Sequence, residues 1–326
     1  MQRSPTILVA ALAALLALPA AAHAQSPVRS VQVAADNDAF NFWLPLPRPD
    51  HDYTHGMRVT VDADAAPLWG KRLGAGLRPC GRGAAAPCLA SRLEVGQEIY
   101  TPRRDAPVSL PGERPYAGWL YAAGTARVLH PRSERTLGVE VGVTGPPSLG
   151  EAVQTRFHDA AGYWEPTGWA GQLGFEPGVV VRLGGARLVA EPRVRGVRAL
   201  TVVPRWGVAA GNVLTGASAG VEAQAGSGVP HPWARGGARE PRVAVYATWA
   251  ARGEWVLRNL FLDGNTFRPS ARVEKLPLVG EWEVGLGVRA GGVVAAFRVV
   301  TRGREYRTEP AAHRYSSIVL AYERAR

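Results

Sequence analysis

Short segments in which small or apolar residues alternate with polar ones recur along most of this chain of 326 residues, and Gly and Pro separate them. Such alternation is typical of antiparallel β-strands that present two different faces. The mean hydropathy of −0.08 excludes a polytopic helical membrane protein, which needs several apolar runs of about 20 residues. Twelve strands are expected, at residues 31–40, 53–62, 93–101, 118–129, 136–144, 168–183, 188–209, 214–225, 243–257, 279–289, 293–301 and 315–322.

The first 24 residues predict a secretory signal peptide. Arg3 supplies a basic start, residues 7–22 form an apolar stretch, and Ala22-His23-Ala24 is a small-x-small cleavage site. Cleavage would leave one exported domain, residues 25–326. A retained N-terminal anchor helix is the alternative.

Export bears directly on the two cysteines of the chain. Outside the cytoplasm, a close pair such as Cys80 and Cys88 favours a disulfide that closes a short loop rich in Gly and Pro. Two thiols with no histidine nearby are too few for a structural zinc site, and two free thiols are the alternative.

An exported chain with an even number of strands predicts an all-β fold, a twelve-stranded antiparallel transmembrane β-barrel of the bacterial outer membrane. Aromatic residues near strand ends, such as Trp119 and Trp282, fit interfacial girdles. The final residues, Tyr322-Glu-Arg-Ala-Arg326, depart from the aromatic end common in such barrels. A secreted β-sandwich or jelly roll is the soluble alternative.

One segment interrupts the β pattern. Residues 148–161 predict a short helix, with Ser148 as N-cap and Glu151 completing a capping box. Gln154 and His158 are four residues apart and therefore share one face of this helix. The helix lies in a connection between two strands and is expected to be an extracellular insertion.

Polar residues cluster at positions that an up-and-down barrel brings together. The clusters are residues 36–38, 52–56, 97–102 and 113–119, the helix, and Glu165. Connections that follow odd-numbered strands emerge at one end of such a barrel, so all six clusters are expected on one rim. With the N-terminus in the periplasm, this rim faces the cell exterior and the loop between Cys80 and Cys88 faces the periplasm.

The rim residues indicate a cation-dependent hydrolase. Oxygen atoms of Asn37, Asp38, Thr54 and Glu165 are hard ligands that suit Ca²⁺. A divalent cation polarises an ester carbonyl and stabilises the oxyanion formed on attack. His158 is placed to deprotonate the attacking water, because an imidazole has an ordinary pKa near 6.5. The Gly-x-Ser-x-Gly match at residues 216–220 lies inside an expected strand and not at a strand-to-helix turn, so it does not indicate a serine nucleophile.

An ordered set of motifs resembles the lipid A 3′-O-deacylase (LpxR-type) family over about residues 31–322. The motifs are Asn37-Asp38-Ala39-Phe40, Tyr53-Thr54-x-Gly56, Gln97-x-Ile99-Tyr100-Thr101-Pro102, Arg114-Pro115-Tyr116-Ala117-Gly118-Trp119, Gly145-Pro146-x-Ser148-Leu149, Gln154-x-x-x-His158, Gly168-Trp169-x-x-Gln172-Leu173 and Phe261-Leu262-Asp263-Gly264-Asn265-Thr266-Phe267. The ordered set is much more specific than any one motif.

The resemblance implies a twelve-stranded outer-membrane barrel that hydrolyses the ester of the 3′-linked acyloxyacyl chain of lipid A with the help of Ca²⁺. Carried over by position, the resemblance makes His158 the base that activates water and gives Gln154 the role of orienting the helix or the substrate. It assigns the cation site and its surroundings to Asn37, Asp38, Thr54 and Glu165, of which Asp38, Thr54 and Glu165 are the ligands. It assigns substrate binding to Arg114, Tyr116 and Tyr53, with Arg114 contacting a phosphate.

Several positions depart from the family pattern, among them Glu113, which stands where the family has the Asp of Asp-Arg-Pro-Tyr. Two departures, Asp52 and His55, add titratable groups beside the site. The family sequence Asp-Arg-Tyr-Tyr-Thr-Asn-Gly is replaced here by residues 50–56, which introduce Asp52 and His55. The placement of Glu165 depends on a one-residue gap in the comparison. These departures affect the expected ligand set and acyl specificity more than the reaction type.

The net charge of +11 comes almost entirely from arginine, which binds phosphate through two parallel hydrogen bonds. For an exported barrel, the expected partner is the phosphorylated head of lipid A or lipopolysaccharide in the outer leaflet, and not nucleic acid. No protein partner is indicated. The alternatives are a related phospholipase and a non-catalytic barrel, either a porin or a surface protein that holds lipopolysaccharide.

Overall fold

The computed structural model describes residues 28–41, 51–65, 76–80, 87–233 and 241–324. The predicted signal peptide lies outside these ranges. No helix within them is long and apolar enough to cross a membrane.

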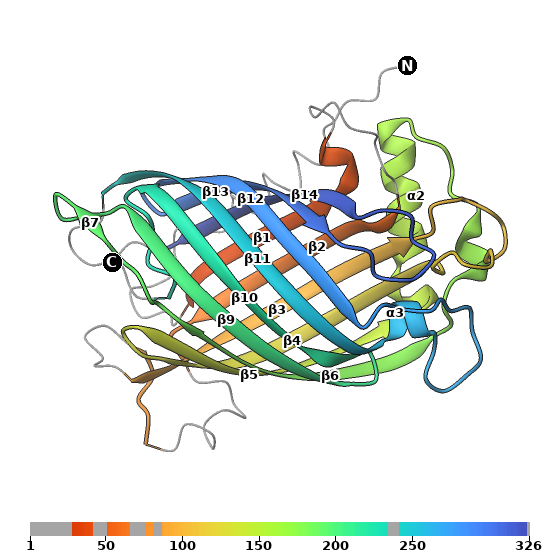
Figure 1. Ribbon diagram of the computed structural model, residues 1–326, viewed down its shortest axis with the longest axis horizontal. Helices are drawn as coiled ribbons and strands as arrows, with labels where there is room; N and C mark the ends of the chain where they lie inside the picture. Colours follow the sequence, from red (N-terminus) through yellow and green to blue (C-terminus); the bar gives the residue numbers. More distant parts are fainter. Residues whose placement is uncertain (1–27, 42–50, 66–75, 81–86, 234–240, 325–326) are drawn as a thin grey trace.

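Twelve strands close into a single antiparallel barrel, which confirms the predicted fold (Figure 1). Each strand pairs with its neighbours along the chain, and the first strand pairs with the last to close the ring. The strands are β1 (Val28–Asn37), β2 (Asp52–Ala63), β3 (Cys88–Thr101), β4 (Ala117–Leu129), β5 (Ser133–Thr144), β6 (Glu176–Arg187), β9 (Leu200–Gly211), β10 (Leu214–Ser227), β11 (Val243–Asn259), β12 (Leu278–Ala290), β13 (Val293–Arg302) and β14 (His313–Glu323).

Three predicted strands differ from the observed ones. The segment expected as a strand over 31–40 ends in a 3-10 helix, η1 (Asp38–Asn41), after β1. The segment expected as a strand over 168–183 begins as a 3-10 helix, η3 (Gly168–Gly171), and β6 starts only at Glu176. The segment expected over 188–209 contains a small hairpin, β7 (Arg193–Val194) and β8 (Val197–Arg198), before β9 begins. Arg195 and Gly196 form the hairpin turn, with φ angles of 51° and 82° that a strand does not allow.

The polar clusters expected on one rim do share one rim. The register places Asn37 opposite His55, Tyr100 opposite Ala117, and Thr144 opposite Glu176, each at the same end of the barrel. We call this end the α2 rim, because it carries α2 (Gly150–Ala161), the predicted helix.

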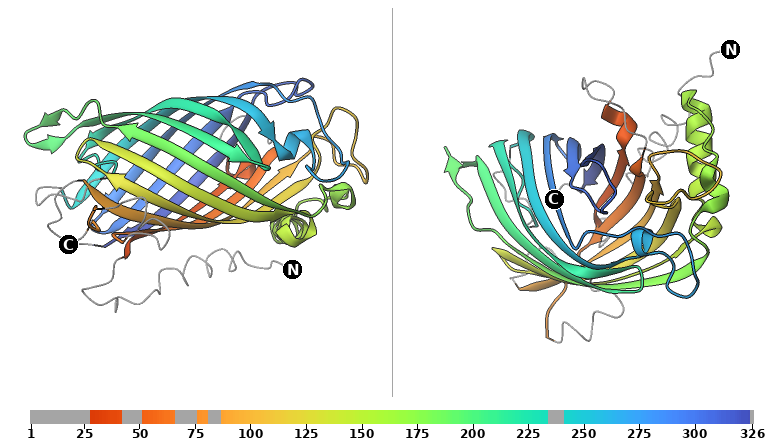
Figure 2. Two further views of the ribbon diagram at one scale, coloured as in Figure 1. Left: turned by 90° about the horizontal axis from the view of Figure 1, so that it is seen from below. Right: turned by 45° about the vertical axis from the view of Figure 1, so that its right-hand side comes forward.

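The helix α2 packs outside the barrel wall against β3 and β4 (Figure 2). Its attachment uses Gln97 of β3, whose Nε2 donates a hydrogen bond of 2.7 Å to the Ser148 carbonyl. The approach is so close that a Cβ on Gly118 of β4 would lie 2.1 Å from Ser148 Oγ and 3.2 Å from the Gly150 Cα. Glycine at position 118 therefore lets the first turn of the helix contact the wall.

The predicted start of this helix is wrong by one residue. Ser148 belongs to a preceding 3-10 helix, η2 (Pro146–Ser148), and its hydroxyl donates to the Gly145 carbonyl at 2.6 Å. Leu149 occupies the N-cap position in a left-handed conformation, so the capping box with Glu151 does not form. The hydroxyl serves the tight Gly145-Pro146 turn and is not directed to the helix.

Both ends of the barrel are covered by packed segments. At the α2 rim, α3 (Leu260–Asp263) turns inward, and Phe261 stacks on Tyr100 with ring centroids 4.5 Å apart. At the opposite end, Trp233 is buried; its indole donates to the His130 carbonyl at 2.9 Å, and its own carbonyl accepts from Arg29 at 3.2 Å. These two bonds attach Trp233, which follows β10, to β1 and to the turn between β4 and β5.

A disulfide joins Cys80 and Cys88 at this opposite end of the barrel. Both cysteines pack in one buried cluster with Trp233 and Leu188. The bridge thus fixes the loop before β3 against the segment that covers this end.

Candidate functional site

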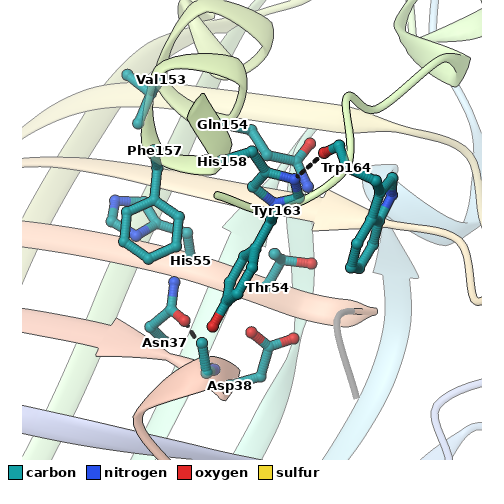
Figure 3. A pocket seen from close by; sticks show the side chains of 11 residues that line it. Asn37, Asp38, Thr54, His55, Val153, Gln154, Phe157, His158, Tyr163 and Trp164 are labelled. Atoms are coloured by element: carbon teal, nitrogen blue, oxygen red, sulfur yellow. Dashed lines mark hydrogen bonds between the residues drawn. The ribbon is translucent and has the colours of Figure 1, made fainter. Parts of the chain in front are cut away.

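A cavity of about 210 Å³ lies between α2 and the ends of β1 and β2 at the α2 rim (Figure 3). Its barrel side is polar and its helix side is largely aromatic and apolar. The lining residues are Asn37, Asp38, Ala39, Thr54, His55, Val153, Gln154, Phe157, His158, Tyr163 and Trp164.

Gln154 and His158 both line this cavity, as their spacing predicts, and both are buried. The Oε1 atom of Gln154 accepts a hydrogen bond of 2.8 Å from the indole of Trp169. This bond ties the middle of α2 to η3. Gln154 therefore fixes the orientation of the helix that carries His158.

The ring of His158 is held in one tautomer. Its Nδ1 lies 2.6 Å from the backbone carbonyl oxygen of Trp164. Because a carbonyl oxygen only accepts hydrogen bonds, Nδ1 carries the proton, and Nε2 of the neutral ring is the basic nitrogen. The rings of Tyr163 and Trp164 meet the imidazole edge-on, with centroids 5.5 and 5.2 Å away.

The oxygen donors of the barrel side are set by local bonds at the ends of β1 and β2. Asn37 Oδ1 accepts from the Ala39 amide at 2.7 Å, and Asp38 Oδ2 accepts from the His51 amide at 3.1 Å. Thr54 Oγ1 lies 2.6 Å from Thr101 Oγ1 of β3. In Figure 3 the Tyr163 ring extends from the helix side toward Asn37 and Asp38.

Comparison with known proteins agrees with this architecture. The model of the family described as outer membrane protein LpxR matches residues 8–324. The chain belongs to the LpxR family. This confirms the predicted resemblance and places the barrel in the outer membrane.

The solved structure of LpxR from Salmonella typhimurium superposes with a TM-score of 0.72 at 18% identity, covering 90% of this chain and 100% of that one. Other barrels are more distant. The translocator domain of the autotransporter NalP from Neisseria meningitidis gives a TM-score of 0.44 at 12% identity, covering 97% of this chain and 96% of that chain. The KdgM porin gives 0.40 at 7%, covering 91% and 99%. No curated protein matches.

Glu165, predicted as a cation ligand from the LpxR family pattern, lies elsewhere. Its side chain is exposed, and it is not among the described residues that line the cavity. The preceding residue, Trp164, contributes the carbonyl that orients His158. The structure therefore brings Asp38 and Thr54 together at the site without Glu165.

The three residues predicted to bind substrate also lie away from the cavity. Arg114 is 1% exposed, and its Nη1 lies 3.1 Å from Glu305 and 3.9 Å from Asp52. Tyr53 points into the barrel and donates to Asp36 at 3.0 Å. A phosphate reaches Arg114 only by breaking buried ion pairs, so the structure does not support the predicted phosphate-binding role.

Tyr116 has a structural role beside the site. It packs on Trp169 with ring centroids 5.0 Å apart and donates to Asp105 at 2.7 Å. Asp105 also accepts from the backbone amide and the hydroxyl of Thr167, each at 3.0 Å. These bonds anchor the segment between α2 and η3 to the loop after β3.

Asp52 and His55, two of the departures from the LpxR family pattern, have different surroundings. His55 lines the cavity, whereas Asp52 is buried among Arg103, Tyr306 and Arg114. Oxygen or nitrogen atoms of Asp52, Glu309 and His313 lie within 4.8 Å of one another, a grouping able to hold a metal ion. The guanidinium of Arg103, 3.0 Å from Asp52 and 3.8 Å from Glu309, already neutralises these carboxylates. We therefore assign this cluster to ion pairing.

Several cavity residues were not predicted. Val153 directly precedes Gln154, and Phe157 directly precedes His158. Val153 and Phe157 are therefore also four residues apart, and this spacing identifies them as cavity residues once the buried face of the helix is known. The Trp164 carbonyl has no sequence signal, because every residue carries a backbone carbonyl.

We expect the anchor at Asp105 to be lost in acid. Burial raises the pKa of Asp105, but the hydrogen bonds from Tyr116 and Thr167 outweigh burial and hold the pKa below its ordinary value of 3.8. The stabilisation is therefore present above pH 3.8 and is lost as the pH falls through the lower folded-state pKa. Hydrogen exchange at the Thr167 amide, corrected for intrinsic rates, should lose protection below pH 3.8. In Asp105→Ala, which removes the acceptor, protection should be low at every pH; equal protection in this variant and the wild type would contradict the role of Asp105.

Proposed function

We propose that this protein is a lipid A deacylase that hydrolyses the ester of the 3′-linked acyloxyacyl chain, with His158 as the general base. The observation that carries the proposal is the 2.6 Å contact of His158 Nδ1 with the Trp164 carbonyl, at a cavity that also contains Asn37, Asp38 and Thr54. Membership of the LpxR family supports the same substrate class.

The fixed tautomer supports a direct role in proton transfer. With its proton on Nδ1, the neutral ring accepts a proton from water at Nε2, and the Trp164 carbonyl stabilises the imidazolium that results. The attacking water then adds to the ester carbonyl carbon. On collapse of the tetrahedral intermediate, the imidazolium returns the proton to the departing sugar oxygen, so the fatty acid leaves and the base is regenerated.

The donor set fits a calcium ion in chemical class. The carboxylate of Asp38, the hydroxyl of Thr54 and the amide oxygen of Asn37 are hard oxygen donors on one side of the cavity. These three supply fewer than the six to eight oxygens that Ca²⁺ takes, so water and substrate would complete the shell. Bound there, the ion would act as a Lewis acid that stabilises negative charge on the ester oxygen.

The position of the cavity suits a glycolipid substrate. We place the α2 rim on the exterior side, as is usual for barrels whose N-terminus lies in the periplasm. Val153, Phe157 and Trp164 give the helix side an apolar surface for acyl chains, and the barrel side holds the polar groups. An ester that joins chain and sugar would lie between the two.

The barrel ends argue against the porin alternative. Phe261 and Trp233 cover opposite ends of the lumen, and ion pairs such as Arg182 with Glu140 and Arg302 with Glu254 bridge the lumen wall. A lumen built this way supports a barrel that positions a site on its outer wall. A stable conductance of the purified protein in planar bilayers would favour the porin.

Expression in lipopolysaccharide-producing cells followed by mass spectrometry of lipid A tests the proposal. We expect loss of the mass of one 3′ acyloxyacyl group, compared with cells that carry an empty vector. An unchanged lipid A profile, with Ca²⁺ supplied and the folded protein present in the outer membrane, would refute the deacylase.

Chelation tests the cation separately. With purified protein and lipid A, EGTA in the presence of excess Mg²⁺ should lower the rate at least about 100-fold, because a lost Lewis acid removes several kcal/mol of transition-state stabilisation. Added Ca²⁺ should restore the rate. Full activity in EGTA would rule out the calcium site and leave the base assignment to its own test.

A further inference from the structure

A second, larger pocket lies at the α2 rim outside the site described above. It has a volume of about 760 Å³ and is open. It is formed by the end of β11, by α3 and by residues 272–275 of the loop that leads to β12. The lining residues are Leu257, Arg258, Asp263, Arg272, Val273, Glu274 and Lys275.

This pocket is far from α2 around the ring. The order of strands places β11 six positions from β3 in one direction and five positions from β4 in the other. Because α2 packs on β3 and β4, β11 lies across the ring from α2, although α3 turns inward and contacts Tyr100 of β3. The pocket shares no lining residue with the cavity at His158.

The pocket begins where the lipid-facing surface of β11 ends. Exposed apolar side chains occupy alternate positions of this strand, among them Val245, Trp249, Trp255 and Leu257. At about 3.3 Å per residue and a tilt of about 40°, the strand rises by roughly 30 Å from Val245 to Leu257, slightly more than the apolar band of about 25 Å. Leu257 therefore lies at the edge of that band, level with the lipid headgroups.

Three cations meet at this level. Arg258 is held rigidly: its Nε donates to the Asn212 carbonyl at 2.7 Å and its Nη2 to the Gly264 carbonyl at 3.0 Å. Lys275 lies 3.0 Å from Asp263. Arg272 is exposed and has no hydrogen-bond or ion-pair partner within the described part of the chain.

The acidic residues of the pocket are already engaged. Asp263 pairs with Lys275 and accepts from the Asn259 amide at 2.8 Å. Glu274 pairs with Arg307 at 2.6 Å. The guanidinium of Arg272 is therefore left to bind an anion, with Arg258 fixed beside the same pocket.

We propose that this pocket binds a phosphate group of a phosphorylated glycolipid in the outer leaflet, with Arg272 as the principal contact and Arg258 and Lys275 as supporting cations. The site rests on the exterior orientation proposed above, and it is non-catalytic. Its ligand combines a phosphate, which matches the cations, with acyl chains, which match the apolar surface below Leu257 and Leu278. A bound glycolipid would hold the far wall of the barrel at a fixed depth in the leaflet.

Native mass spectrometry of the detergent-solubilised protein tests this site. The protein carries His158→Ala, so that bound glycolipid is not hydrolysed, and it is titrated with bis-phosphorylated lipid A. We expect Arg272→Ala to raise the dissociation constant of one bound glycolipid at least about tenfold, the loss of one charged hydrogen bond. Arg272→Glu should raise it further.

Controls separate the source of the phosphate and the effect of charge. Arg135→Ala removes an exposed arginine near the start of β5, at the end of the barrel opposite the α2 rim. This variant should leave the dissociation constant unchanged. Dephosphorylated lipid A should bind as weakly to the wild type as phosphorylated lipid A binds to Arg272→Ala. Equal binding by the wild type and both Arg272 variants would overturn the site, and displacement of lipid A by millimolar inorganic phosphate would overturn its assignment to a glycolipid.

The outcome is independent of the deacylase proposal. Arg272→Ala in an otherwise wild-type chain should retain deacylation in detergent micelles, because Arg272 does not line the cavity that contains His158. Loss of deacylation in this variant would contradict a non-catalytic site. Absence of deacylation in the wild type as well would refute the proposed function and leave the binding result standing.

Discussion

Replacement of His158 by alanine is expected to lower the rate constant of deacylation by about 10² to 10⁴, with little change in KM. The reason is local: His158 is 2% exposed, and its Nδ1 is committed to the Trp164 carbonyl, which leaves Nε2 as the basic nitrogen. The substrate surface formed by Val153 and Phe157 remains in the variant. Steady-state kinetics with purified lipid A and Ca²⁺ measures the effect.

A matched control lies on the same helix. Arg156 is exposed on α2, two residues before His158, and Arg156→Ala should keep the wild-type rate. Both variants should migrate as folded barrels on unheated electrophoresis gels. A rate above about a tenth of the wild-type value in His158→Ala would exclude the general-base role, because removal of a base costs at least about 100-fold.

Much of the fold was predictable because strand alternation and strand topology constrain each other. Period-two alternation identified the strands, and antiparallel order then placed residues 36–38 and 52–56 on one rim without any knowledge of contacts. The same alternation misidentified residues 168–171, where Gly-Trp-Ala-Gly has a strand-like pattern. There the indole of Trp169 bonds to Gln154, and this tertiary contact outweighs local preference.

The site was predictable where it depends on spacing and not where it depends on distant partners. A spacing of four placed Gln154 and His158 on one buried face. The family resemblance assigned Arg114 to a phosphate, but its partner Glu305 lies 191 residues further along the chain. The local sequence gives no signal for such a distant pair. Arg114 is buried together with Glu305 and is therefore not at the surface.

Removal of Arg302 is expected to destabilise the barrel by about 3 to 5 kcal/mol, the usual cost of leaving buried charges without their partner. Its guanidinium contacts three carboxylates in the lumen: Glu254 at 2.7 Å, Glu281 at 2.9 Å and Glu305 at 2.9 Å. Burial raises the pKa of Glu305, but Arg302 and Arg114 outweigh burial and lower the pKa to about 2. In Arg302→Ala the three carboxylates repel one another with one cation fewer.

Unfolding in urea from lipid vesicles, followed by tryptophan fluorescence, measures this cost, and two further variants identify its cause. Arg302→Lys keeps the charge but loses the planar fork, so it should fall between alanine and the wild type. Arg307→Ala removes an arginine whose pair with Glu274 has side chains 68% and 66% exposed, and should cost far less than Arg302→Ala. Equal losses at positions 302 and 307 would mean that the lumen is as well hydrated as the surface.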